Sequence, residues 1–320
     1  MKLIHKLLPI SMLLALSLSA AAADVPTMLA EGRVDDAIHS LQTRLDTVPN
    51  DAESYNLMCR AYFALGNWDR GIPYCEKSVN LAPNNARYHL WLGRIYGEKA
   101  DRANWFTAAS MAGKVRTEFE TAVKLDPDNA EARTDLGEFY LEAPGIMGGG
   151  RDKAEAQARA LDSLDPSRAE WVRGRIAEKN KDLVMAEKHY RASITASHGS
   201  ALSWLNLALF YRNHNRLDEM EDAIRHASAA QTGHSEVLVD AAETLNRTGR
   251  SIPTAIDLLR RYLASSSTVE AAPAFKAHYL LGTLLEKEGD KQAAADQYRQ
   301  ALLLAKSYFA AQDALNRLSR

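Results

Sequence analysis

This 320-residue chain has a recurring spacing of about 34 residues, and this spacing limits the possible folds more than any other feature of the sequence. Four prolines that follow runs of helix-forming residues are separated by 34, 44 and 39 positions: Pro49, Pro83, Pro127 and Pro166. A series of small residues has spacings of 34, 44, 37, 34, 34 and 40: Cys59, Gly93, Gly137, Gly174, Ala208, Ala242 and Gly282. A unit of about 34 residues with occasional insertions explains both series.

Composition indicates that this unit is helical. The strong helix formers Ala, Leu, Glu, Lys and Arg dominate the sequence,. Alternating runs of β-branched residues, which would indicate strands, are nearly absent. We therefore predict an all-α chain of about seven antiparallel helical hairpins. One hairpin cannot bury its own apolar face, so the hairpins must stack on one another as a solenoid.

The unit resembles the tetratricopeptide repeat. That repeat has an aromatic residue, then leucine, a small residue and tyrosine in its first helix, and alanine, an aromatic residue and proline in its second. Two units match this pattern well, namely Trp204, Leu207, Ala208 and Tyr211 in one, and His89, Leu92, Gly93, Tyr96, Phe119, Ala122 and Pro127 in the other. The resemblance covers about residues 30–320 and implies a right-handed α-solenoid whose first helices line a concave groove,.

We expect the two ends of the array to differ from its middle. The first unit is reduced to roughly its second helix, Val34 to Val48, as an N-terminal half unit. At the other end, a lone helix from Tyr308 to Leu318 is expected to cap the last hairpin,.

Two insertions lengthen adjacent hairpins, near residues 97–110 and 143–150. The first carries Trp105 and Phe106, and the second carries Ile146 and Met147. Both are expected in the turn inside a hairpin, so both would lie at the same edge of the stack. Two interpretations stay open: the apolar residues form a ridge that contacts a partner, or they pack against each other.

Residues 1–23 have the three-part pattern of a secretory signal peptide. Lys2 and Lys6 precede the apolar stretch Leu7–Leu18, and a run of small residues ends at Ala23,. We predict cleavage after Ala23, export to the periplasm if the source is a bacterium, and a single superhelical domain over residues 24–320. The apolar stretch is shorter than the roughly 20 residues of a membrane span. No stable membrane insertion is therefore expected after cleavage, and a retained anchor is the alternative.

Charge and motifs argue against nucleic-acid binding and against catalysis. Removal of Lys2 and Lys6 changes the formal net charge from −2 to −4, without the basic footprint that a nucleic-acid backbone requires,. The nine histidines show no HExxH spacing, and no GxSxG motif is present,. The glycine run 148–150 lacks the lysine and hydroxyl residue of a phosphate loop,. We predict a protein that is not an enzyme and has no cofactor and no metal.

The two cysteines belong to the two helices of one predicted hairpin. Cys59 takes the small position of the first helix, and Cys75 lies one turn beyond Gly71 in the second. In an oxidising compartment they would form a structural disulfide that clips the hairpin, since nothing resembles a CxxC redox motif. The alternative is two buried thiols that act as small apolar residues.

The resemblance implies that groove residues lie on the face opposite the small-residue contacts. The candidates on this face are Asn56, Arg60, Phe63, Arg94, Trp171, Arg175, Leu202, Leu205, Leu209, Val239 and Tyr279. Leu202, Leu205 and Leu209 form an apolar stripe at helical spacing. The stripe is expected to be open for a peptide or helix, unless the curvature of the superhelix covers it.

The function implied by the resemblance is a non-enzymatic adaptor or scaffold that binds a protein or peptide in its concave groove. The alternative is an accessory subunit of an exported solute-capture or transport system, in which the superhelix encloses a small ligand. The identity of the partner and the oligomeric state stay open, because specificity in repeat arrays depends on variable surface residues.

Overall fold

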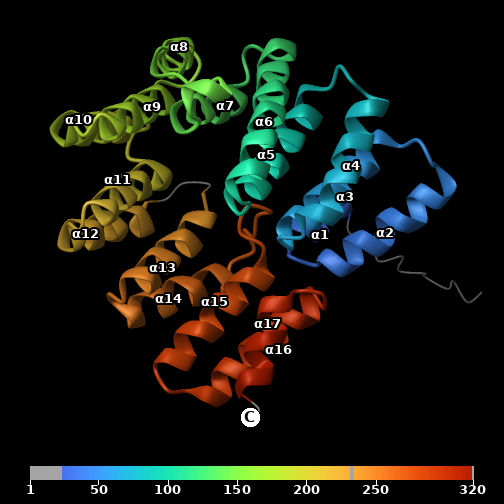
Figure 1. Ribbon diagram of the computed structural model, residues 1–320. Helices are drawn as coiled ribbons and strands as arrows, with labels where there is room; N and C mark the ends of the chain where they lie inside the picture. Colours follow the sequence, from blue (N-terminus) through green and yellow to red (C-terminus); the bar gives the residue numbers. More distant parts are fainter. Residues whose placement is uncertain (1–23, 231–233, 319–320) are drawn as a thin grey trace, which may run out of the picture.

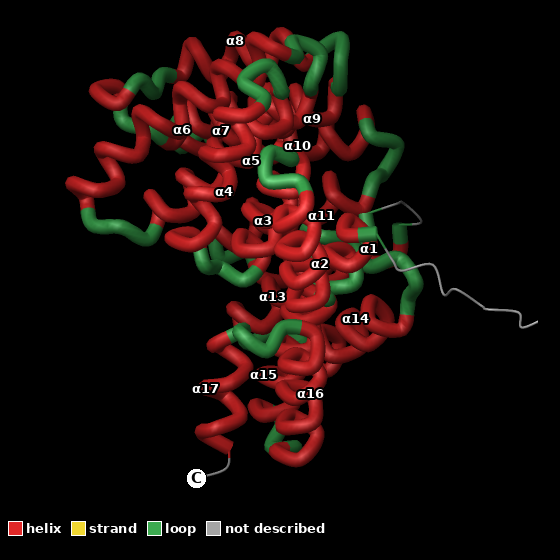
Figure 2. Tube along the Cα trace, turned by 90° about the vertical axis from the view of Figure 1, so that its right-hand side faces the viewer, coloured by secondary structure: helices red, strands yellow, loops and turns green. Residues whose placement is uncertain are grey.

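The computed structural model describes residues 24–230 and 234–318, and its regular elements there are all helical (Figures 1 and 2). The predicted signal segment lies outside these ranges. The α-helices are α1 (Val25–Ala30), α2 (Val34–Thr47), α3 (Ala52–Ala64), α4 (Trp68–Leu81), α5 (Ala86–Asp101), α6 (Trp105–Leu125), α7 (Ala130–Glu142), α8 (Arg151–Leu161), α9 (Pro166–Lys179), α10 (Leu183–Ala196), α11 (Ala201–Asn213), α12 (Leu217–Ala229), α13 (Glu236–Thr248), α14 (Ile252–Ala264), α15 (Ala274–Lys287), α16 (Lys291–Leu304) and α17 (Phe309–Leu318). A short 3-10 helix, η1 (Gly145–Met147), precedes α8.

Consecutive helices pair as hairpins, from α1 with α2 to α15 with α16, and α17 packs on α16. Each hairpin also packs on its neighbours in the sequence, so the chain is an α-solenoid, as predicted,. The helices follow one another around the molecule, and α8 and α17 lie at opposite ends in both views (Figures 1 and 2).

Small residues allow the two helices of a hairpin to approach closely. A Cβ added to Gly93 would lie 2.5 Å from ring atoms of Phe119, and one added to Gly282 would lie 2.5 Å from the ring of Tyr298. The ring of the second helix therefore occupies the space that a larger residue would need. The Tyr298 hydroxyl then donates a hydrogen bond to Glu286 at 2.8 Å, which satisfies the one polar atom that the ring brings into the hairpin,.

The two ends of the solenoid meet. We call the contact between α1–α3 and residues 270–311 the seam (Figure 1). Leu29 and Met58 share one apolar cluster with Phe275, which is fully buried. The backbone N–H of Lys306 donates to the Asp35 carboxylate at 2.6 Å.

Gly32 makes the closest backbone approach across the seam. Its φ is 76°, and an added Cβ would lie 2.7 Å from the backbone nitrogen of Ala274. Any side chain at this position would be strained by the backbone conformation and would also clash with the other end of the chain. The solenoid is therefore a closed turn and not an open groove with two free ends.

The N-terminal unit and the insertions differ from expectation. The first unit has its own first helix: α1 is six residues long, and the Asp24 carboxylate accepts a hydrogen bond from the Thr27 backbone at 3.1 Å as its N-cap,. The first insertion is mostly helical, since α5 continues to Asp101 and α6 begins at Trp105. Helix extension satisfies the backbone groups of these residues without a long loop.

Of the two interpretations left open for the insertions, packing of their apolar residues on one another does not hold at Ile146. This side chain is 93% exposed, so it does not rest on Trp105 or Phe106. Trp105 and Phe106 instead contact each other edge to face, with ring centroids 5.2 Å apart, and both are exposed. The second insertion is contacted by α6 beyond the first insertion, where Arg116 donates to the carbonyl oxygen of Met147 at 3.4 Å.

Candidate functional site

The first helices of the hairpins present a continuous surface on the inside of the solenoid, which we call the inner surface. Three adjoining cavities of about 390, 450 and 700 Å³ lie along it, and we name them the serine, middle and seam cavities. The middle cavity shares Phe63 and Glu98 with the seam cavity, and Asp135 and Glu138 with the serine cavity. A bound chain that follows the inner surface would therefore pass from one cavity to the next.

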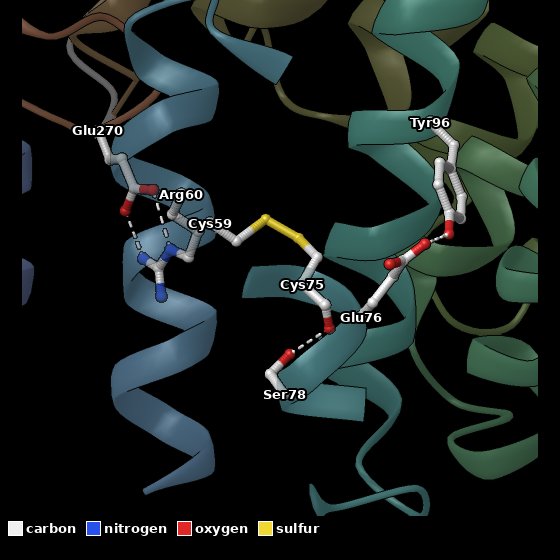
Figure 3. The surroundings of a disulfide bond; sticks show 7 residues. All are labelled: Cys59, Arg60, Cys75, Glu76, Ser78, Tyr96 and Glu270. Atoms are coloured by element: carbon white, nitrogen blue, oxygen red, sulfur yellow. Dashed lines mark hydrogen bonds and ion pairs between the residues drawn. A yellow bond between two sulfur atoms is a disulfide. The ribbon is translucent and has the colours of Figure 1, made fainter. Parts of the chain in front are cut away.

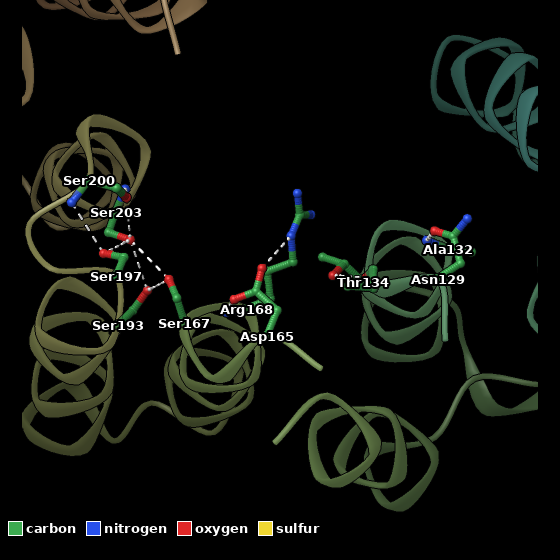
Figure 4. A network of polar contacts seen from close by, with 11 residues as sticks. Asn129, Ala132, Thr134, Asp165, Ser167, Arg168, Ser193, Ser197, Ser200 and Ser203 are labelled. Carbon is green, nitrogen blue, oxygen red and sulfur yellow. Dashed lines mark hydrogen bonds and ion pairs between the residues drawn. The ribbon is translucent and has the colours of Figure 1, made fainter. Parts of the chain in front are cut away.

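The wall of the serine cavity contains a cluster of hydroxyl groups (Figure 4). Ser167 of α9, Ser193 of α10 and Ser203 of α11 lie within 3.0–3.2 Å of one another, oxygen to oxygen. Ser197 and Ser200 bond to Ser203 at 2.9 and 3.1 Å. Because these hydroxyls satisfy one another, the cluster fixes three helices together and presents few free donors to a ligand.

The helix that carries Ser167, α9, also brings an aromatic ring and an ion pair to the serine cavity. Trp171 is half-buried, and the Arg175 guanidinium lies 5.5 Å from its ring centroid. Arg168 pairs with Asp165 at 3.1 Å, and its side chain points between α9 and α7 (Figure 4). Leu202 adds an apolar contact at the rim. This combination suits an amphipathic segment of a partner, with the indole as an anchor.

The middle cavity is bordered by paired charges. Arg94 donates to Asp135 at 2.7 Å and to Glu131 at 2.6 Å, and Arg175 donates to Glu138 and Glu142 at 2.6 and 2.9 Å. Burial raises the pKa of Asp135 above its ordinary value, although Arg94 opposes this shift,. These pairs join neighbouring first helices and set their spacing.

The seam cavity takes its walls from both ends of the chain. Phe63, Trp68 and Glu98 come from the first hairpins, and Val239, Asp240, Lys276 and Tyr279 come from the last. Burial raises the pKa of Asp240 to about 6, and Glu243 and Glu236 add to the shift. Burial lowers the pKa of Lys276, although the carboxylates of Glu98, Glu243 and Asp240 oppose this shift,. The Asp240 side chain is open to the interior of the cavity, and the cavity walls surround it.

An ion pair closes the seam beside a disulfide (Figure 3). Arg60 of α3 donates from Nε to Glu270 at 2.9 Å, and a second guanidinium nitrogen contacts the other carboxylate oxygen. The two side chains are only 14% and 18% exposed. The next residue, Cys59, is bonded to Cys75 of α4, with Cα atoms 5.2 Å apart. The disulfide therefore ties the helix that carries Arg60 to its partner helix.

The structure corrects the predicted exposure of several groove residues. Asn56 is fully buried, and its amide nitrogen and oxygen have no hydrogen-bond partner among the described residues. Leu205 is 2% exposed and belongs to the core, so the predicted open stripe is interrupted at its centre. Val239 is also buried, although it reaches the wall of the seam cavity. The reason is curvature: neighbouring first helices such as α11 and α13 pack side by side and cover the flanks of each inner face.

The other predicted residues lie on the inner surface as separate groups. Phe63 and Tyr279 reach the seam cavity, and Phe63 also borders the middle cavity beside Arg94. Trp171 and Leu202 line the serine cavity. Leu209 lines one smaller hollow, and Arg175 lines another. Arg60 is occupied by Glu270 and is not free for a partner.

Sequence reasoning missed three charged residues that line the seam cavity and the partner of Arg60 in the seam. Glu98 and Lys276 lie one helical turn from the predicted residues Arg94 and Tyr279, so a wider reading of those two faces would have found them. Asp240 directly follows Val239 and lies about 100° around the helix from it, so that face does not predict it. The partner of Arg60 gives no such signal, because Glu270 lies in an irregular segment between α14 and α15.

Comparison with known proteins agrees with this geometry. Tetratricopeptide-repeat families match residues 28–96 and 237–314. The solved yeast Tom70 is similar with a TM-score of 0.53 and 14% identity, over 96% of this chain and 66% of that chain. The Cut9–Hcn1 hetero-tetramer of the APC/C matches with a TM-score of 0.42 and 14% identity, over 92% of this chain and 54% of that chain. A curated relative, the CTR9 homolog of Arabidopsis thaliana, is 25% identical over 131 residues.

The match to the CTR9 homolog covers 38% of this chain and only 10% of that protein. At 14% identity, the likeness to Tom70 shows the fold alone. Residues 28–96 and 237–314 therefore match tetratricopeptide repeats, and the hairpins between them continue the same α-solenoid. Tetratricopeptide repeats serve in general as scaffolds for protein interaction. The two family descriptions name no catalytic activity. Among the helices described, none is long and apolar enough to cross a membrane.

Proposed function

We propose that this chain is an adaptor that binds a protein or peptide along its inner surface. The observation that carries the proposal is the continuity of the serine, middle and seam cavities, which are joined by shared residues along successive first helices. An extended segment or a helix of a partner would contact several hairpins at once. Each hairpin then adds a few contacts, as expected of a repeat scaffold.

We propose Trp171, Phe63 and Tyr279 as anchors for the partner, because half-buried aromatic side chains supply large contact areas at low entropic cost,. Leu202 and Leu209 would add apolar contacts between them. Arg94 and Arg175 already have carboxylate partners. They are therefore proposed to shape the surface and to interact with a partner only at its polar rim.

We further propose that the mature chain is exported and, in a bacterium, works in the periplasm. The signal pattern over residues 1–23 supports this location, and so does the bond between Cys59 and Cys75, because disulfides persist in oxidising compartments,. N-terminal sequencing of the purified native protein tests the prediction, since a chain that begins at Asp24 is expected.

A second function is favoured by the seam cavity. Its volume of about 700 Å³ lies within the range of small-molecule sites, and its walls are aromatic and charged,. The chain would then be a small-ligand-binding subunit of a solute-capture or transport system. Native mass spectrometry of the purified protein separates this function from the adaptor function, because a retained small molecule is expected only for ligand capture.

Affinity capture from extracts of the source organism tests the adaptor function. The wild-type chain is compared with a Leu202→Glu, Leu209→Glu double variant and with Val184→Glu, whose side chain is 84% exposed on a second helix. We expect the wild type and Val184→Glu to capture the same protein and the double variant to lose it, with circular dichroism showing that all three are folded. Capture by the folded double variant at wild-type level would contradict the proposal.

A further inference from the structure

The charged side chains in the seam cavity are arranged differently from those elsewhere on the inner surface. Around the middle cavity, arginines and carboxylates are in direct contact, as in Arg94 with Asp135. In the seam cavity, Glu98, Asp240 and Lys276 have no side-chain hydrogen bond or ion pair to any residue that the structure describes. Opposite charges therefore face the same space without touching.

The origin of these groups explains the separation. Glu98 comes from α5, Asp240 from α13 and Lys276 from α15, so the charges stand on three different walls. Lys276 is half-buried, and the carboxylates of Glu98, Glu243 and Asp240 act on it together with the like charge of Arg102. An enclosed charge without a direct partner is costly, and a ligand that supplies the partner recovers part of that cost.

The rest of the wall is aromatic. Phe63 and Trp68 lie on the side of the first hairpins, and Tyr279, Tyr308 and Phe309 lie on the side of the last. Arg102 is held over Trp68, with its guanidinium carbon 4.6 Å from the ring centroid. The cavity therefore offers an apolar surface, the Lys276 ammonium, the Arg102 guanidinium and three carboxylates. Glu243 is paired with Arg247, which leaves Glu98 and Asp240 as the two carboxylates without an ion-pair partner among the described residues. That set is complementary to a molecule with a carboxylate, an ammonium and an apolar side chain.

We propose that the seam cavity binds a zwitterionic small molecule of the amino-acid or dipeptide class, with its carboxylate on Lys276 and its ammonium on Asp240 and Glu98. This inference rests on the second function proposed above, for which it names the ligand class. Charge-assisted hydrogen bonds at both ends orient the ligand, and the aromatic wall selects an apolar side chain. Because both ends of the chain line the cavity, the ligand binds the closed seam and stabilises it.

Isothermal titration calorimetry of the mature chain tests the ligand class. The probes are L-phenylalanine, L-leucine and the dipeptides of these two, together with phenethylamine and 3-phenylpropionate, which each keep only one charge. We expect one molar equivalent of a zwitterion to bind, at least about tenfold more tightly than either singly charged analogue. Equal affinity for an analogue, or no binding of any zwitterion at about 10 mM, would overturn the proposal.

Variants locate the site. Asp240→Asn and Lys276→Met are each expected to weaken zwitterion binding by about tenfold or more. The matched controls are Asp257→Asn on α14 and Lys287→Met on α15, which lie outside the cavity and should bind as the wild type does. If Lys276→Met does not fold, Asp240→Asn alone decides, because its side chain is exposed to the cavity. Wild-type affinity in folded Asp240→Asn would place the ligand elsewhere and overturn the assignment.

The two proposals fail separately. If native mass spectrometry shows a different retained small molecule and no zwitterion binds, the ligand class is wrong, although ligand capture stands. If neither a retained molecule nor zwitterion binding is found, the second function and this inference both fall.

Discussion

Arg60 and Glu270 are separated by 210 positions in the sequence and form a two-pronged ion pair across the seam. Their side chains are mostly buried, so loss of one partner leaves a charge that water cannot fully solvate,. The pair therefore links the two ends of the solenoid, together with the apolar cluster around Phe275 and the contact between Asp35 and Lys306.

Glu270→Gln is expected to destabilise the closed seam by about 1–3 kcal/mol, because the amide keeps the shape but not the charge. Spin labels at His39→Cys and Leu303→Cys, one on each side of the seam, should report a broader distance distribution in this background. Asp313→Asn removes an exposed carboxylate that pairs with Arg317 within α17 and should leave both stability and distances unchanged,. An unchanged distance distribution in Glu270→Gln would show that the ion pair does not hold the seam.

Gly93→Ala is expected to destabilise the chain by about 1–3 kcal/mol, because the new Cβ would lie 2.5 Å from ring atoms of Phe119,. Gly113→Ala in α6 is the matched control, since an added Cβ there meets nothing within 4 Å. That change should stabilise α6 by up to about 1 kcal/mol through higher helix propensity. Urea unfolding measures both free energies, and a neutral Gly93→Ala would mean that the hairpin spacing is not set by this contact.

Loss of the disulfide in a Cys59→Ser, Cys75→Ser double variant should lower stability by roughly 3 kcal/mol, as expected for a bond that closes a loop of this length,. The wild-type chain, unfolded without reductant, should show no thiol that reacts with a thiol reagent. Two reactive thiols per chain in that measurement would mean that the bond does not form in the native protein.

The pKa of Asp240 gives a pH dependence with a definite sign. Burial raises this pKa from its ordinary value of 3.8 to about 6, so the folded protein binds the proton more tightly than the unfolded chain does. The resulting stabilisation is present below about pH 4 and is lost as the pH rises to about 6,. Urea unfolding measures the free energy of unfolding across this pH range. As the pH rises, this free energy should fall less in Asp240→Asn than in the wild type.

Asp257→Asn, an exposed change on α14, should keep the wild-type slope of stability against pH. Direct titration of Asp240 by NMR should give a pKa near 6. A value near 4 would mean that solvent in the seam cavity screens the carboxylate fully.

The repeat spacing was sufficient to predict the hairpins because it reports local packing. Gly93 and Gly282 occupy their positions because Phe119 and Tyr298 lie against them, and the same relation recurs between Gly174 and Tyr190. The spacing also assigned Phe63, Trp171 and Leu202 to the inner surface, since helical periodicity fixes which residues share a face,.

Curvature was not predictable from the same pattern. Small rotations between hairpins add up along the array and decide whether its ends meet. Those rotations bury Leu205, place Arg60 against Glu270 and bring Asp240 and Lys276 to one cavity. The sequence of a single unit does not reveal these three outcomes, because each outcome depends on contacts between different hairpins.

Site-specific photo-crosslinking in cells of the source organism shows whether a partner protein binds the inner surface. A photoreactive phenylalanine replaces Phe63 or Leu202 on the inner surface, and Val184 or Leu303 on exposed positions of second helices. We expect the same protein to be crosslinked from both inner positions and from neither outer one. A protein crosslinked from Val184 or Leu303 and from neither inner position would contradict it.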